Sequence, residues 1–401
     1  KSPITVLSSE KEHTYSRPLI SYLLGGDIEE EQMYYRDPDF YEKNNVEARL
    51  GTEVAGIDEK KKIVVTSEKE KIKYDRLLIA TGGIPIRPDI PGMNCEGVFN
   101  FLSWNDADRV SEYIEKRKVE RVTVIGGGLI GVKAMEALAA RGLQIDLIEL
   151  APHVLSTMLD EEGAFIIHKH VEDQGVSLHC NTTVEKIRTN YDSVAAVKLS
   201  NGEEFDCGMV IVAIGVRPNI EIVKDAGVET DRGILVNDRM ETSSEGVYAA
   251  GDVTQGYDFL MSENRPLAIF PSAYKQGYTA GVNMAGGEKR HPGGMAMNSV
   301  SVCGLPSISV GVIKPDDPDC EILKRTDKEK GIYQKVILKD NRIIGAMFVN
   351  SIDRAGIYTG LIRSGVQISK IRDTLLTDQF GLLMLPKEYR KHVVSGMGIE
   401  V

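Results

Sequence analysis

The sequence predicts an α/β protein in which two related Rossmann-like nucleotide-binding domains are followed by an α+β domain. Two stretches, 74–82 and 210–218, each have the pattern of a buried strand that is closed by a glycine. Between them, residues 121–149 have the pattern of a strand, a glycine turn, a helix and a second strand, which is a complete βαβ unit. Strand patterns return after Met295 and give way to helical spacing over 357–376, which predicts a separate α+β domain at the C-terminus.

The composition excludes several classes of protein. The 59 acidic and 48 basic residues leave a net charge of −11, which argues against a general nucleic-acid binder. No apolar run approaches the ~20 residues that span a bilayer, and the N-terminus lacks the layout of a signal peptide, so a cytoplasmic protein is expected. The five cysteines lack a Cys-x-x-Cys pair and the seven histidines form no metal-ligand set, so neither a disulfide framework nor a metal site is expected.

The opening residues already have the pattern of a strand at 4–7, which indicates that the chain enters its fold at a second strand. We therefore expect that a preceding segment is absent. Proline and glycine punctuation at 91–92 and at 292–294 predicts domain boundaries at those places.

The glycine turn after the predicted strand at 121–125 has the spacing Gly126, Gly128 and Gly131. In a βαβ unit these glycines allow a tight turn, the close approach of a pyrophosphate, and close packing of the helix on the strand. Glu149 follows 23 residues after Gly126, at the strand end where a carboxylate binds the adenosine ribose hydroxyls and repels a 2′-phosphate. The unit therefore predicts an NADH site. A glycine-rich turn without nucleotide, and a merely solvated Glu149, are the alternatives.

A second nucleotide site is indicated at 242–253, where Asp252 directly follows a buried strand and Gly251. Taken alone, Asp252 could simply cap a helix. Together with the glycine turns at 80–82 and 213–215, however, these residues resemble the FAD-dependent pyridine nucleotide–disulfide oxidoreductase superfamily. The resemblance is to the branch that holds NADH oxidases, rubredoxin and ferredoxin reductases and NADH-dependent nitrite reductases, and it covers nearly the whole chain.

The resemblance implies a FAD site that is assembled from separate parts of the chain. Asp252 is expected to bond the ribityl chain, Glu10 the adenosine ribose, and the backbone of Val54 is expected to contact adenine. The helix start at 269–273 is expected beneath the flavin. Besides the glycine turn and Glu149, the residues assigned to cofactor binding are Glu10, Pro18, Val54, Thr81, Gly82, Gly215, Gly251, Asp252, Phe270 and Ala273.

The resemblance also divides the chain into four segments. Residues 1–106 form the first part of a FAD-binding domain whose opening strand and glycine turn are absent, 107–227 form the NAD-binding domain, and 228–292 complete the FAD-binding domain. Residues 295–401 form a C-terminal α+β interface domain, which implies a homodimer. Without its own glycine turn the FAD diphosphate loses helix-terminus amides, so weak or absent flavin binding is expected of this chain.

Arg17 occupies the position where thiol-using members of the superfamily carry a redox cysteine. No cysteine precedes Cys95, so a thiol relay is not expected. The stretch from Tyr15 to Ser21 instead resembles the rubredoxin, ferredoxin and nitrite reductase members. The hypothesis is that NADH delivers hydride to FAD and that electrons pass singly to a small carrier protein or an associated redox centre. Arg17 is the predicted catalytic residue, stabilising the reduced flavin; alternatively, it pairs with a carboxylate at a helix start.

Two other functions stay open on the sequence: an NADH oxidase that reduces oxygen directly, and an NADH-binding sensor or interaction module without flavin chemistry. The chain also departs from the family at Lys133, where relatives have a glutamate that lines the nicotinamide pocket. Glu136 is placed to compensate by pairing with Lys133 across one helical turn. Trp104 is expected to pack rather than to stack on a cofactor.

Overall fold

The computed structural model describes residues 3–385, and these residues fold into two compact units. The first unit contains Lys1–Leu150 and Thr182–Gly294, and the second contains Ala151–Asn181 and Met295–Val401. Three parts of the predictions lie outside the described residues: the N-terminal end of the segment 1–106, the C-terminal end of 295–401, and His392. The boundaries of the four predicted segments stay a prediction. Within the described part of the chain, no helix is long and apolar enough to cross a membrane.

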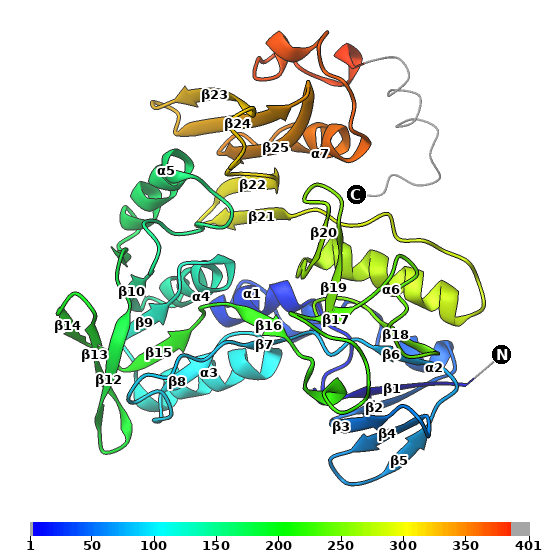
Figure 1. Cartoon of the computed structure of the whole chain (residues 1–401). Coiled ribbons are helices and arrows are strands. Elements are labelled where there is room, and N and C mark those ends of the chain that lie inside the picture. Colours follow the sequence, from blue (N-terminus) through cyan, green and yellow to red (C-terminus); the bar gives the residue numbers. More distant parts are fainter. Residues whose placement is uncertain (1–2, 386–401) are drawn as a thin grey trace. The chain divides into compact units, whose positions relative to one another are not determined.

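The first unit contains a parallel sheet with the order β10, β9, β15, β8 (Figure 1). The residues of β9 and β15 are almost completely shielded from solvent, which is the burial that a parallel sheet covered on both faces requires. The elements of this half are β8 (Val98–Asn100), α3 (Trp104–Arg117), β9 (Arg121–Ile125), α4 (Leu129–Ala140), β10 (Gln144–Ile148) and β15 (Met209–Val212).

An antiparallel meander covers one face of this sheet. It consists of β12 (Val184–Asn190), β13 (Ser193–Leu199) and β14 (Glu204–Asp206). Apolar side chains of the meander and the sheet form one buried cluster, in which Val197 and Val210 are fully shielded from solvent. This shared core fixes the sheet whose strand ends carry the glycine turn.

The other half of the first unit is built from small sheets. β1 pairs in parallel with β2, and β6 pairs in parallel with β18. Its elements are β1 (Ile4–Ser8), η1 (Arg17–Leu19), α1 (Ile20–Gly25), η2 (Glu30–Met33), α2 (Phe40–Lys43), β2 (Val46–Leu50), β3 (Val54–Asp58), β4 (Ile63–Thr66), β5 (Lys71–Lys73), β6 (Leu77–Ile79), η3 (Glu221–Val223), β17 (Ile234–Leu235), β18 (Val247–Ala249), β19 (Thr254–Asp258), β20 (Glu263–Arg265) and α6 (Phe270–Met284).

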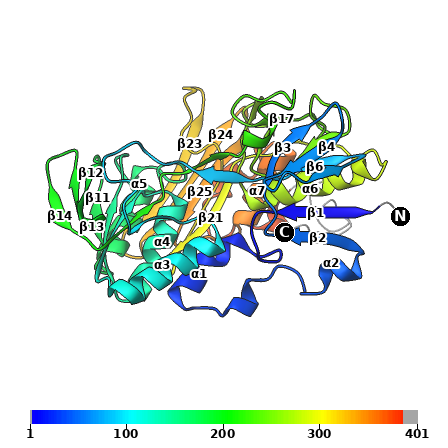
Figure 2. The same ribbon diagram turned by 90° about the horizontal axis from the view of Figure 1, so that it is seen from below.

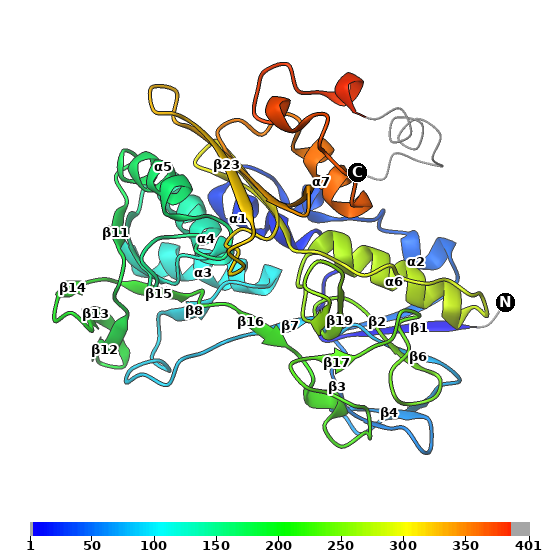
Figure 3. The same cartoon turned by 45° about the horizontal axis from the view of Figure 1, so that its top comes forward.

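The two halves of the first unit are joined by a two-stranded antiparallel ribbon (Figure 3). It consists of β7 (Gly83–Pro85) and β16 (Val216–Pro218), with Arg217 paired to Ile84. Each strand directly follows one of the two glycine turns that the sequence shows in duplicate. The duplicated pattern is therefore the place where the chain passes between the halves.

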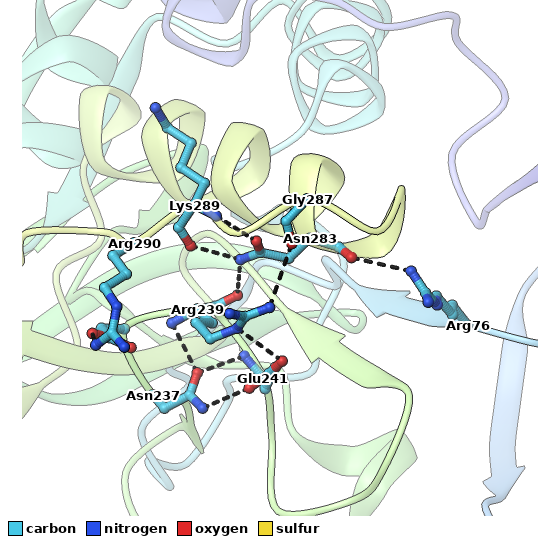
Figure 4. A network of polar contacts seen from close by, with 9 residues as sticks. Arg76, Asn237, Arg239, Glu241, Asn283, Gly287, Lys289 and Arg290 are labelled. Atoms are coloured by element: carbon cyan, nitrogen blue, oxygen red, sulfur yellow. Dashed lines mark hydrogen bonds and ion pairs between the residues drawn. The ribbon is translucent and has the colours of Figure 1, made fainter.

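The end of α6 is held by a network of polar contacts (Figure 4). Asn283 is 2% exposed. Its side-chain nitrogen donates to the backbone carbonyls of Arg239 and Lys289, both at 2.8 Å, and its side-chain oxygen accepts from the backbone N–H of Lys289 at 2.7 Å. The guanidinium of Arg76 donates to the carbonyls of Asn283 and Met284, which satisfies acceptors that a helix end leaves unpaired. The network fixes the helix whose first turn carries Phe270.

The second unit is an antiparallel five-stranded sheet with the order β21, β22, β25, β24, β23. Its elements are α5 (Glu161–Glu172), β11 (Ser177–His179), β21 (Met297–Val302), β22 (Leu305–Gly311), β23 (Glu321–Asp327), β24 (Ile332–Lys339), β25 (Arg342–Val349), α7 (Ala355–Ser364), η4 (Arg372–Thr374) and η5 (Leu382–Met384). The helix predicted over 357–376 is shorter than expected, because Gly365 takes a left-handed conformation and ends α7.

A buried ion pair fastens α5 to this sheet. Asp160 caps α5 through the amide of Gly163 at 3.1 Å, and it accepts from Lys335 and from the hydroxyl of Tyr333, both at 2.8 Å. Burial alone would raise the pKa of Asp160, but these hydrogen bonds outweigh it and hold the pKa below its ordinary value. The side chain of Lys335 is only 6% exposed, so it depends on Asp160 for its counter-charge.

We predict that Asp160→Asn lowers the free energy of unfolding at pH 7 by about 3 kcal/mol, because asparagine keeps the helix cap and leaves Lys335 buried without its counter-charge. The pKa of Asp160 is lower in the folded protein than the ordinary aspartate value of about 3.9. The ionised carboxylate therefore stabilises the fold above about pH 3.9, and this stabilisation is lost as the pH falls through the folded-state pKa. The difference in free energy of unfolding between wild type and Asp160→Asn should therefore disappear below about pH 4. Urea unfolding of the intact chain across this pH range measures it.

The matched control is Glu162→Gln on the same helix. Glu162 pairs with Lys324, but the two side chains are 53% and 40% exposed, so the loss should stay below about 1 kcal/mol. Two results would contradict the role of the buried pair. One is an equal loss of unfolding free energy in Asp160→Asn and Glu162→Gln. The other is a loss in Asp160→Asn that does not change with pH.

Candidate functional site

The glycine turn of the first unit is sterically required at two positions. Gly126 follows β9 and takes a φ of +105°, and a Cβ on it would lie 2.4 Å from the carbonyl oxygen of Ala213. A Cβ on Gly131 would lie 1.8 Å from the carbonyl oxygen of Gly126. The amide of Gly126 also donates to the carbonyl of Ile148 at 2.8 Å. Only glycine therefore lets α4 approach the ends of β9 and β15 this closely.

Gly128 differs from its two neighbours, because a Cβ built there would have no protein atom within 4 Å. It is the N-cap residue of α4, and no side chain of the described residues caps this helix. The first amides of α4 therefore face open space at the positive end of the helix dipole. Open space in front of unpaired helix amides is what the binding of a dinucleotide diphosphate requires.

Glu149 directly follows β10 and lies against the same turn. Its carboxylate accepts a hydrogen bond from the amide of Gly127 at 2.5 Å. The structure thus brings Glu149 together with Gly126, Gly128 and Gly131, and it does not leave the carboxylate merely solvated. The expected contact between Glu149 and an adenosine ribose stays a prediction.

Arg17 lies in a second group of polar side chains. As the first residue of η1, it donates to the carboxylate of Glu10 at 2.5 Å and to the carbonyl of Leu102 at 2.8 Å. Burial raises the pKa of Tyr15, whose hydroxyl donates to the second oxygen of Glu10 and accepts from the amide of Trp104 at 3.1 Å. Arg17 therefore makes the carboxylate pair that was the alternative expectation, and its role toward a flavin stays a prediction.

Asp252 follows Gly251 beyond the end of β18 and belongs to the same group. Burial raises the pKa of its carboxyl, and the nearby positive charge of Arg17 opposes that shift. Among the described residues no hydrogen bond reaches this carboxylate, whereas the amide of Gly251 donates to Gln276 at 2.8 Å. A half-buried carboxylate without a donor fits the hydroxyl groups of a bound sugar or ribityl chain.

Thr81, Gly82 and Gly215 lie together where the ribbon between the halves begins. The hydroxyl of Thr81 donates to the carbonyl of Asn219 at 2.7 Å. Gly82 and Gly215 have φ values of +65° and +120°. A Cβ on Gly82 would have no protein atom within 4 Å, and on Gly215 the nearest would be the Cδ1 of Ile86 at 3.8 Å. Both turns therefore expose backbone that a ligand can approach.

The remaining predicted residues are distributed around this half. Phe270 and Ala273 lie in the first turn of α6, and the Cβ of Ala273 lies 3.6 Å from the Cβ position of Gly251. Pro18 follows Arg17 in η1. Val54 opens β3, and the hydrogen bonds and ion pairs of the described residues do not link it to the group around Arg17.

The expected pairing of Lys133 with Glu136 and the expected packing of Trp104 are both confirmed. Lys133 forms an ion pair with Glu136. Trp104 is 4% exposed and packs edge-on against Tyr15, with the ring centroids 5.6 Å apart. The sequence did not predict that Lys133 also lies over the ring of Tyr22, because 111 positions separate them in the chain.

Family models match both units. Residues 1–277 match the pyridine nucleotide-disulphide oxidoreductase family, and residues 297–366 match the C-terminal domain of rubredoxin NAD+ reductase. FAD and NAD(H) are the cofactors of this family. Asp252 without a donor and the open space at Gly128 fit these two groups.

Curated proteins and solved structures agree with these models. The chain is 29% identical to nitrite reductase [NAD(P)H] of Bacillus subtilis, over 92% of this chain and 44% of the relative. It is 34% identical to an NADH oxidase of Methanocaldococcus jannaschii, over 72% of this chain and 65% of the relative. The crystal structure of NADH:rubredoxin oxidoreductase from Clostridium acetobutylicum is 27% identical with a TM-score of 0.76, covering 92% of this chain and 90% of that chain.

The chain thus spans less than two thirds of the length of the first two relatives. The fold is the expected α/β architecture of two Rossmann-like dinucleotide-binding domains and a C-terminal α+β domain. Because the family model matches residues 1–277, which is more than half of the chain, the chain belongs to the pyridine nucleotide-disulphide oxidoreductase family of enzymes.

Proposed function

We propose that this chain passes hydride from NADH to FAD and then electrons to a rubredoxin-, ferredoxin- or nitrite-reductase-type acceptor. The observation that carries the proposal is the open space at Gly128 and the start of α4, with the Glu149 carboxylate beside it. The group formed by Arg17, Glu10 and Asp252 supplies the second half of the site within the same unit.

In this proposal the glycine turn binds NADH. The amides at the start of α4 hold the diphosphate, since they combine unpaired donors with the positive end of the helix dipole. Glu149 accepts from the hydroxyls of the adenosine ribose and disfavours the 2′-phosphate of NADPH by charge repulsion. Gly215 lets the backbone approach the nicotinamide half of the nucleotide.

Bound FAD supplies the two-electron acceptor for the hydride and a relay that releases electrons one at a time. Asp252 accepts from the hydroxyls of its ribityl chain, and Glu10 is the carboxylate for its adenosine ribose. Arg17 provides a positive charge shared between Glu10 and Asp252, which stabilises negative charge that develops beside it. Thr81, Gly82, Gly251, Pro18, Phe270, Ala273 and the backbone of Val54 complete the proposed lining of the FAD site.

The acceptor is proposed from what the chain resembles and from the residue at position 17. Arg17 stands where a thiol relay would need a cysteine, and the first cysteine along the chain, Cys95, is buried. The C-terminal match to a rubredoxin reductase domain, and relatives named for rubredoxin and nitrite, favour a small redox carrier or an associated redox centre. A homodimer and a cytoplasmic location belong to this proposal and rest on the sequence alone.

The acceptor is tested by anaerobic stopped-flow spectroscopy of the protein with added FAD. NADH should bleach the flavin absorbance near 450 nm, and rubredoxin or ferredoxin should restore it faster than air-saturated buffer does. Reoxidation by air that is faster by about a hundredfold or more would favour the NADH oxidase instead. A protein that binds NADH but never retains flavin would favour a sensor or interaction module.

The diphosphate site is tested by two alanine substitutions in the same turn. Gly128→Ala should fold normally, because its φ of −75° suits alanine and no atom is nearby, yet it should weaken NADH binding about tenfold or more. Gly131→Ala should instead lower the free energy of unfolding by about 1–3 kcal/mol through overpacking. Calorimetric titration and urea unfolding separate the two effects. Unchanged NADH affinity in a folded Gly128→Ala protein would contradict the site.

The nucleotide preference is tested at Glu149. Glu149→Gln should weaken NADH binding about tenfold, because it removes the charged acceptor for the ribose hydroxyls. It should weaken NADPH binding less, because it also removes the repulsion of the 2′-phosphate. Glu115→Gln on α3 is the control, since its side chain is 72% exposed and lies outside the proposed site. A ratio of NADH to NADPH affinity that stays at the wild-type value in Glu149→Gln would refute the assignment.

A further inference from the structure

Among the contacts that link the two halves of the first unit, one lies between α1 and α4. The ammonium nitrogen of Lys133 on α4 lies 4.5 Å from the ring centroid of Tyr22 on α1. Lys133 is 19% exposed, and its ammonium also pairs with Glu136 on its own helix. A cation held over an aromatic face and partly removed from water is a stronger contact than an exposed one.

The same two helices touch again one turn further along. A Cβ on Gly25, three residues after Tyr22, would lie 3.5 Å from the Cα of Ala137, four residues after Lys133. The contacts therefore advance in the same direction along both helices, and α1 lies beside α4 (Figure 2). A Cβ at Gly25 would meet Ala137 at an ordinary van der Waals distance, so the two helices are in normal packing contact at this second point.

Both helices begin at a proposed cofactor site. α1 follows directly on Arg17–Leu19, and α4 follows directly on the glycine turn. A contact between these helices therefore sets the separation between the residues that hold the flavin and those that hold the nicotinamide nucleotide.

We propose that Tyr22 and Lys133 form a positioning clamp that holds the NADH half against the FAD half at the distance hydride transfer requires. This inference rests on the proposed NADH-to-FAD activity. Hydride passes only when the reacting atoms approach to about 3–3.5 Å, so a small shift between the helices is costly. Because Glu136 neutralises Lys133, the clamp acts through placement and not through a net charge at the reacting atoms.

The test measures three quantities on the FAD-loaded protein: the rate of flavin bleaching at saturating NADH, the dissociation constant of NADH, and the long-wavelength charge-transfer absorbance of nicotinamide stacked on flavin. Tyr22→Leu and Lys133→Met should each slow bleaching about tenfold and diminish the charge-transfer absorbance. Because Glu149 and the glycine turn are untouched, NADH affinity should change less than about twofold. The double variant should be no slower than either single one, because both remove the same contact.

Conservative variants and a matched control separate placement from general damage. Tyr22→Phe keeps the ring and Lys133→Arg keeps the cation, so both should retain most of the rate. Lys289→Met removes a comparable contact, with the ammonium 4.8 Å from the ring centroid of Tyr278, and it should leave all three readouts unchanged.

The clamp would be refuted if Tyr22→Leu and Lys133→Met kept the wild-type bleaching rate. It would also be refuted if the double variant were slower by the product of the two single effects. Either result leaves the proposed NADH-to-FAD activity intact. Wild-type protein whose flavin NADH does not bleach would overturn the proposed activity and the clamp with it.

Discussion

The close packing of glycine backbone at the start of α4 is the constraint on which the rest of the site depends. Gly131 lies against the carbonyl of Gly126, and Gly126 lies against the carbonyl of Ala213 on the neighbouring strand end. This packing draws the first amides of α4 over the ends of β9 and β15, while Gly128 leaves the space in front of them open. A larger side chain at either packed position would move the helix away, and the space for a diphosphate would lose its shape.

The second half of the unit meets a different requirement, which is to hold two carboxylates around the charge of Arg17 in a partly buried place. Arg17 donates to Glu10 and also lowers the electrostatic cost of Asp252. Tyr15 supplies a further donor to Glu10, but Asp252 has no donor among the described residues. Sugar hydroxyls are the donors that this arrangement lacks, which links the electrostatics of the group to the chemistry proposed for it.

The sequence predicted the parts of this account that depend on short-range patterns. The glycine turn with Glu149 at the next strand end follows from one βαβ unit, and the pairing of Lys133 with Glu136 follows from one helical turn. Contacts made by distant segments were not predictable in this way, because only the folded chain brings them together. Asp160 meets Lys335, and Tyr22 meets Lys133, through tertiary packing that no local pattern specifies. The end of α7 was missed because the left-handed conformation of Gly365 outweighs the apolar spacing that continues beyond it.

Hydrogen exchange at the glycine turn tests the central claim most directly, since it reads the amides themselves. The account predicts that the amides of residues 129–131 exchange more slowly, by about tenfold or more, when NADH is bound at saturation. NADH that binds and protects other segments while these amides exchange at an unchanged rate would contradict the claim that the start of α4 holds the diphosphate.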